Sequence, residues 1–339
     1  MAEGPSWLPE AVRSVALRLA RVEELIYTVG EACFSWSRAG PLQLVQHRSQ
    51  GGLALTVASI RPIPPIVGLH ISESINHLRA ALDNVVFYMV ADRRAQELTE
   101  KQRRAVSMPI HHTAERFDRW TGDMTRRGLP ELAGAHELAE RIRRLQPFTD
   151  MQRAVGSTSD LLGAMIGTRP EYEHPLTLLH GYSNADKHHA LRVTAARAFV
   201  SRHDLPFFSD DRSPRPVLVG DVLHTIREGV PTIVDMNSWV GVERPDGVTW
   251  VPPARELHEL CRYVSEVAVP ILVTGSDQVA PLPLTVDLGD SGATVEERLA
   301  HGRQDSAQDR LRAVMARAVA EGYDAPPQVA PIEDSPDSS

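Results

Sequence analysis

The chain of 339 residues has very little cysteine: only Cys33 and Cys261. Two thiols cannot supply a disulfide framework or a four-ligand zinc site, so a protein of the reducing cytoplasm is expected. The sequence has no run of 18 apolar residues and no basic segment followed by an apolar one at its start. Membrane spanning and secretion are therefore both unexpected.

Several catalytic motifs are also missing. Neither GxGxxG nor GxxxxGK[ST] occurs, which argues against a P-loop hydrolase, and no GxSxG string occurs for a serine hydrolase. The HEL strings at His136 and His258 lack the second histidine of a zinc protease. We expect neither a metal nor a cofactor.

The charge balance excludes a general polyanion-binding surface. The 44 acidic residues outnumber the 36 basic ones and leave a net charge of -8. Only Lys101 and Lys187 are lysines, so 36 − 2 = 34 of the basic residues are arginines. A compact ammonium suits a point-charge role such as holding a phosphate oxygen, although chance alone could also place a lysine at position 187.

The pattern of apolar residues predicts a mainly α protein. Spacings of three and four over Leu8–Trp36 and over Pro65–Arg93 are typical of long helices that pack on one another. Alternation in Leu42–His47 and Gly51–Ile60 predicts a strand pair between them. Further helical patterns complete a predicted helical bundle over residues 7–190: 113–125, 130–145 and 175–189.

The texture changes after residue 190. Runs rich in Val, Thr, Ile and Trp, followed by a helical pattern at Arg255–Val273, predict a small α+β region over 191–275 with an antiparallel sheet. The apolar residues on one side of segment 294–322 predict a helix that is loosely attached at the periphery. The end, 323–339, is rich in Pro, Asp and Ser and is expected to be a disordered tail.

Two polar segments stand out as a candidate site. On the helix that follows Pro65, Asn76, Arg79 and Asp83 lie at i, i+3 and i+7, beside the apolar stripe. The second segment carries Asn184, Asp186, Lys187 and His188. Buried charges need partners, so the two segments are expected to meet although about 105 residues separate them.

Four short strings resemble a family of uncharacterised bacterial proteins. HLRAALDN, MPIHH, LQPF and NADKHHAL stand in the order of that family's LR-small-ALD, FPI, QP-aromatic and DKH strings, over about residues 60–200. Met108 stands where the family more often has Phe. The resemblance implies a shared fold and no established activity.

At the level of fold, the helical pattern is similar to HEPN-type bundles, which include metal-independent ribonucleases of toxin and defence systems. Their Arg-x4–6-His motif has three matches, starting at Arg104, Arg169 and Arg197. About four are expected by chance, so the matches carry no information. Pro109 and Pro170 also break the helix that the motif needs in the first two.

These observations support two hypotheses. In the first, a defence-like cytoplasmic protein binds RNA or another phosphate ligand, with Asn76, Asp83, Asn184 and Asp186 as ligand-binding groups. If it is an enzyme, His188 is the general base, and Arg79 and Lys187 stabilise phosphoryl charge. In the second, a noncatalytic interaction protein uses the same charges as a polar lock, meaning a buried, fully paired set of charges between helices. Its long helices would support a homodimer.

Overall fold

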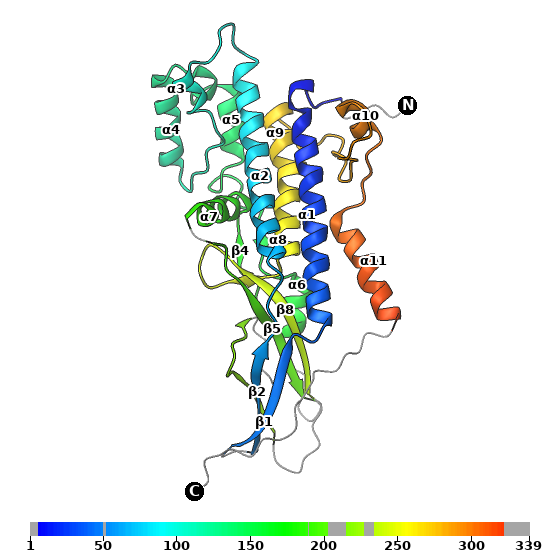
Figure 1. Cartoon of the computed structure of the whole chain (residues 1–339). Coiled ribbons are helices and arrows are strands. Elements are labelled where there is room, and N and C mark those ends of the chain that lie inside the picture. Colours follow the sequence, from blue (N-terminus) through cyan, green and yellow to red (C-terminus); the bar gives the residue numbers. More distant parts are fainter. Residues whose placement is uncertain (1–5, 50–51, 189, 203–214, 227–233, 322–339) are drawn as a thin grey trace.

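The computed structural model describes residues 6–49, 52–188, 190–202, 215–226 and 234–321. Within them the protein is mainly α, with antiparallel sheets (Figure 1). No helix in the described part of the chain is long and apolar enough to cross a bilayer.

The two longest helices lie side by side and carry the core. A 3-10 turn at Glu10–Val12 leads into α1 (Arg13–Arg38), and α2 spans Ile66–Ala91 (Figure 1). Both predicted long helices are confirmed. Their buried residues recur at spacings of three and four: Val15, Leu19, Val22, Ile26 and Val29 on α1, and Ile71, Ile75, Leu78, Leu82 and Val85 on α2.

The strand pair between these helices is confirmed as well. Strand β1 (Leu42–Ser49) pairs antiparallel with β2 (Gly52–Ile60). A third strand, β7 (Val222–Ile226), comes from the later region and pairs with the other edge of β2. This pairing was not predicted, because a strand's partner depends on where the chain returns in space.

Shorter elements follow α2: α3 (Glu100–Arg103), α4 (Ala114–Arg126), a 3-10 turn (Pro130–Leu132), α5 (Glu137–Arg144), α6 (Asp160–Ile166) and α7 (Pro175–His188). The predicted helix at 130–145 is therefore two pieces. The chain is extended at Ala133, and the ring nitrogen of His136 caps the start of α5 by accepting a hydrogen bond from the Leu138 amide at 3.2 Å.

The predicted antiparallel sheet has the strand order β6 (Arg215–Pro216), β5 (Val193–Arg202), β8 (Val234–Glu243) and β9 (Trp250–Val251). A small separate pair joins β3 (Val155–Gly156) to β4 (Tyr172–Glu173). Next come α8 (Pro253–Tyr263), a π-turn (Val264–Ala268) and α9 (Val269–Thr274). The π-turn lies just before Pro270, which has no amide hydrogen to donate into the helix.

The apolar core does not divide at residue 190. Helix α8 packs against both α1 and α2, and one cluster of buried side chains runs from Leu8 to Ala307. The change in texture at 190 is thus a change of secondary structure within one continuous core.

The peripheral region is docked rather than loose. It forms two helices, α10 (Val295–Ala300) and α11 (Ala307–Ala320). The buried Glu23 carboxylate on α1 accepts a hydrogen bond from the Ala307 amide at 2.6 Å, and Leu311 packs so closely on Gly30 that a Cβ there would lie 2.3 Å from it. The predicted tail, 323–339, lies outside the described residues.

Candidate functional site

An ion pair on α2 holds the loop that carries the MPIHH string. Arg79 and Asp83 are one helical turn apart, and their side chains pair at 3.4 Å. Arg79 Nη2 donates to the Met108 carbonyl at 2.7 Å, and the Met108 amide donates to Asp83 Oδ1 at 2.8 Å. The pair therefore grips both main-chain polar groups of Met108.

A buried amide holds the other side of the same loop. Gln146, from the LQPF string, is fully buried. Its Oε1 accepts from the His111 amide at 2.9 Å, and its Nε2 donates to the Pro109 carbonyl at 3.1 Å. The loop of residues 108–111 is thus held by hydrogen bonds to its main chain. These bonds do not use the side chains of His111 and of the next residue, His112.

The NADKHHAL string reaches this place from α7. Asp186 Oδ2 accepts hydrogen bonds from Ser72 Oγ at 2.7 Å and from Asn76 Nδ2 at 3.1 Å, both on α2. The prediction that the two polar segments meet is confirmed by these contacts. Helix α2 therefore contacts both the MPIHH loop and the NADKHHAL string, and the LQPF string contacts the same loop.

A group of imidazole and cationic side chains gathers where α7 crosses α2. Burial is the first cause that lowers the pKa of His180, and the positive fields of its neighbours lower it further: Arg79, His112, Lys187 and His111. We call these five residues the imidazole cluster. Because its pKa is lowered, His180 is a neutral base at physiological pH.

Two atoms of the imidazole cluster are buried without a partner. Arg79 Nη1 and His111 Nε2 have no hydrogen-bond partner among the described residues. The pKa of His111 is lowered, first by burial and then by Arg116 and His112. A buried polar atom left unpaired costs about 1–3 kcal/mol, so both atoms favour a further partner, which for Arg79 Nη1 must be an acceptor.

The predicted site residues fall into two groups. Asn76, Arg79, Asp83 and Asp186 are used by protein partners and position the helices and the loop. The others face outward: Asn184, Lys187 and His188 are exposed on α7, and in the described part of the chain no ion pair uses Lys187 or His188. No described contact joins His188 to Arg79, so its role as a base stays a prediction.

The sequence reasoning missed His180, His111 and His112 as members of the site. A signal was present for His180, which precedes Asn184 and Lys187 by four and seven residues and so shares their helical stripe. Asn184 Nδ2 lies 3.0 Å from His180 Nε2, as this spacing requires. The pair at 111 and 112 follows no helical period, because it lies in a loop.

A second polar centre shows what a true lock looks like in this protein. Arg244 and Glu256 are each only 2% exposed and pair through two contacts of 2.8 Å. Tyr182 of α7 donates to the same carboxylate at 3.2 Å, and the guanidinium also donates to the carbonyls of Val155 and Glu171. We call this group the Arg244 lock.

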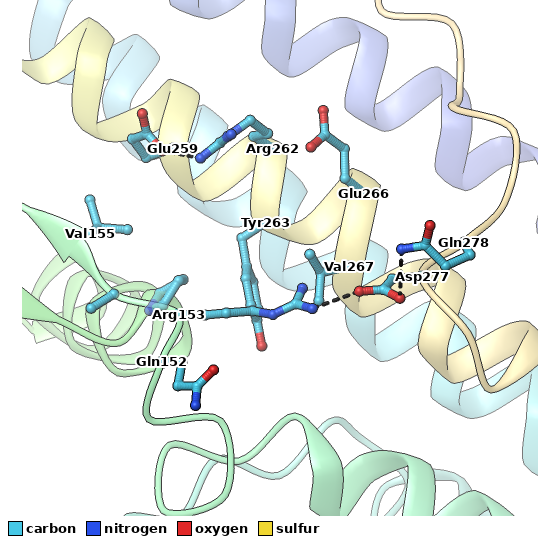
Figure 2. Close-up of a pocket in the computed structure, with 12 residues that line it drawn as sticks. Gln152, Arg153, Val155, Glu259, Arg262, Tyr263, Glu266, Val267, Asp277 and Gln278 are labelled. Carbon is cyan, nitrogen blue, oxygen red and sulfur yellow. Dashed lines mark hydrogen bonds and ion pairs between the residues drawn. The ribbon is translucent and has the colours of Figure 1, made fainter.

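A cavity of about 480 Å³ lies elsewhere, beside α8 and the π-turn. Figure 2 shows that its charged side chains pair mainly with one another: Arg153 with Asp277 at 2.6 Å, and Arg262 with Glu259 at 2.9 Å. The cavity therefore offers a ligand less unpaired charge than the imidazole cluster does.

Among the described residues, no three His, Cys, Asp or Glu side chains are arranged to hold a metal ion. The three histidines of the imidazole cluster are thus not a metal centre in this structure. Comparison of the chain with protein-family models, with curated proteins and with solved structures finds no match.

Proposed function

We propose that the imidazole cluster binds a phosphate group of RNA. The observation that carries the proposal is the convergence of Arg79, Lys187 and three imidazoles at one place. Within the described residues, Asp83 pairs with Arg79, whereas Lys187 is exposed and has no carboxylate partner. An exposed cation without a counter-charge, beside a guanidinium nitrogen that lacks a partner, favours an anionic ligand.

In this proposal the groups divide the work by their exposure. Exposed Lys187 attracts the phosphate as a point charge, while Arg79, whose side chain is 18% exposed, has Nη1 without a partner. A bound phosphate dianion or diester raises the pKa of His180, so phosphate binding and protonation of this imidazole strengthen each other. Binding is therefore expected to tighten as the pH falls.

The same geometry supports metal-independent cleavage of RNA as the activity of the bound state. His180 takes the proton of a 2′-hydroxyl, and the 2′-oxygen forms a bond to phosphorus while the bond from phosphorus to the 5′-oxygen breaks. The exposed imidazole of His112, in its protonated form, gives a proton to the leaving oxygen. The products are a 2′,3′-cyclic phosphate and a 5′-hydroxyl. His180 takes the role that the sequence suggested for His188.

The experiment compares the two lysines of the chain. A labelled RNA oligonucleotide is titrated with the wild-type protein, with Lys187→Met and with Lys101→Met, at several salt concentrations. Lys187→Met should weaken binding and lower the salt slope by about 1, because one phosphate contact is lost. Lys101 lies on α3 and serves as the matched control. Equal binding by both variants and the wild type would contradict the proposal.

Cleavage is tested separately with chelator present. The wild-type protein should release a 2′,3′-cyclic phosphate product from RNA and leave the 2′-deoxy analogue intact, and His180→Gln should abolish this release. His188→Gln tests the hypothesis, drawn from the sequence, that His188 is the general base. Loss of cleavage in His188→Gln alone would return the role of base to His188.

The second hypothesis, a noncatalytic interaction protein, is favoured by one observation. Asn76, Asp83 and Asp186 all have protein partners, as members of a lock should. If RNA does not bind, the polar segments have a structural role only, which is to hold the helices and the loop together. That the helices form a HEPN-type bundle, and that they support a homodimer, also stay predictions.

A further inference from the structure

The surface next to the imidazole cluster is built by α4. This helix begins directly after His112: Thr113 is its N-cap, and the Thr113 hydroxyl accepts the Arg116 amide at 3.4 Å. The imidazole pair and the first turn of α4 are therefore continuous in the chain. Figure 1 shows α4 and α7 on the same side of α2.

Aromatic rings form a floor under this surface. The ring centroids of His111 and Trp120 are 6.3 Å apart, and Phe117 lies 6.3 Å from the first and 5.4 Å from the second. Phe117 is buried, at 1% exposure, whereas Trp120 is only partly buried. Trp120 is thus partly accessible to solvent, within one ring contact of the imidazole cluster.

The outer side of α4 carries positive charge that the protein does not use. Arg116 and Arg119 are exposed, and within the described residues no ion pair or side-chain hydrogen bond engages either guanidinium. The acids nearby are occupied. Asp118 pairs with Arg143 at 2.6 Å, and the Glu115 carboxylate accepts hydrogen bonds at the helix start.

These features lie next to one another in a definite order. Arg116 and Trp120 are four residues apart and so neighbours on one face of α4, and Arg116 is close enough to His111 to lower its pKa. Basic side chains therefore extend from α4 through His112 to Lys187 on α7, with an aromatic ring beside them. A chain of phosphates flanked by a flat ring is the ligand that matches this order.

We propose that the RNA recognised here is single-stranded, with an unpaired base stacked on Trp120 and the neighbouring phosphates held by Arg116 and the imidazole cluster. A duplex hides the faces of its bases within its own stack, so only an unpaired base can lie on an indole ring. This inference rests on the proposed function, because it names the form of RNA that the same site takes.

The test measures the affinity of the full chain for two labelled RNAs, a 12-nucleotide oligoadenylate and a hairpin duplex of equal charge. Trp120→Leu should weaken binding of the single strand about 5- to 150-fold, as expected for loss of one stacked base. Its binding of the duplex should not change. Trp250→Leu is the matched control, because Trp250 is also partly buried and lies beside an arginine, Arg192, but on the sheet.

A second readout guards against a folding defect in Trp120→Leu. The single strand should quench tryptophan fluorescence in the wild type and in Arg116→Gln, and Arg116→Gln should weaken binding of both RNAs together because it removes only charge. Thermal melting checks that each variant is folded. Quenching that survives in Trp120→Leu would overturn the stacking proposal.

The outcomes separate this inference from the proposed function. If the wild type binds duplex and single strand equally, or if Trp120→Leu binds the single strand as the wild type does, the single-strand proposal fails. Sensitivity to Lys187→Met would still support a phosphate site in that case. If the wild type binds neither RNA, both proposals fail.

Discussion

The Arg244 lock and the imidazole cluster are two polar centres to which α7 contributes side chains, and they differ in how far their charges are satisfied. At the lock, a guanidinium and a carboxylate, each 2% exposed, meet with a tyrosine and two carbonyls. At the cluster, Arg79 keeps one nitrogen unpaired, and Lys187 is exposed. The difference teaches that charge at a helix interface serves stability only where partners close around it.

The largest effect is expected from breaking the lock. Arg244→Met leaves the Glu256 carboxylate buried without a counter-charge, which should lower the free energy of unfolding by about 3–5 kcal/mol. Urea denaturation measures the loss. Adding Glu256→Leu should recover most of it, because an apolar pair of similar volume replaces the ions. If the single variant unfolds at the wild-type urea concentration, the lock does not stabilise the fold.

A smaller loss is expected at the loop. Gln146→Leu keeps the volume but leaves the Pro109 carbonyl and the His111 amide without their partners, which should cost about 1–3 kcal/mol. The exposed Gln278 gives the matched control, since Gln278→Leu should stay within about 0.5 kcal/mol of the wild type. Equal unfolding curves for the two variants would show that the amide is not needed to hold the loop.

The pH dependence of stability sharpens the comparison further. The pKa of His180 is lowered in the folded protein. Below pH 6.5, the approximate pKa of an ordinary histidine, the unfolded chain therefore binds more protons than the folded protein, and the stability decreases as the pH decreases. Above about pH 7 both states are neutral there, and the contribution vanishes. His180→Gln should therefore lose less stability than the wild type between about pH 7 and pH 5.5.

Urea denaturation at both pH values checks this difference. The slope should be reduced rather than abolished in His180→Gln, because His111 and His77 also have lowered pKa values. If the free energy of unfolding changes with pH equally in the two proteins, the pKa of His180 is not lowered by folding.

The smallest effect is expected at Lys187. Its side chain is exposed and makes no ion pair within the described structure, so Lys187→Met should change the free energy of unfolding by no more than about 0.5 kcal/mol. A member of a lock would behave differently, since losing it would leave a carboxylate unpaired. A drop of several degrees in melting temperature would therefore assign Lys187 to a lock.

The sequence predicted the parts of the fold that depend on local periodicity. Both long helices, the strand pair and the later antiparallel sheet follow from spacings of three and four or from alternation. The split of 130–145 depends on main-chain geometry at Ala133, and the pairing of β7 with β2 depends on where a distant segment returns. Neither feature changes the spacing of apolar residues along the chain, so neither could be predicted from it.

The candidate site could be predicted only in part for a similar reason. Asn76, Arg79 and Asp83 were visible as a stripe on one helix, and their meeting with Asp186 followed from the need of buried charge for partners. The Arg244 lock was not predicted, because Arg244 and Glu256 lie on different elements with nothing between them to suggest a pair. His111 and His112 depend on a loop whose shape is set by Gln146.

The way in which that loop is held has a consequence for how this protein can vary. Arg79, Asp83 and Gln146 contact the main chain of residues 108–111, and the main chain offers nearly the same atoms whatever residues follow one another. The Met108 side chain is fully buried and contributes to the apolar core. Substitutions at positions 111 and 112 therefore leave these main-chain contacts in place, so the same loop conformation can carry side chains of a different chemistry.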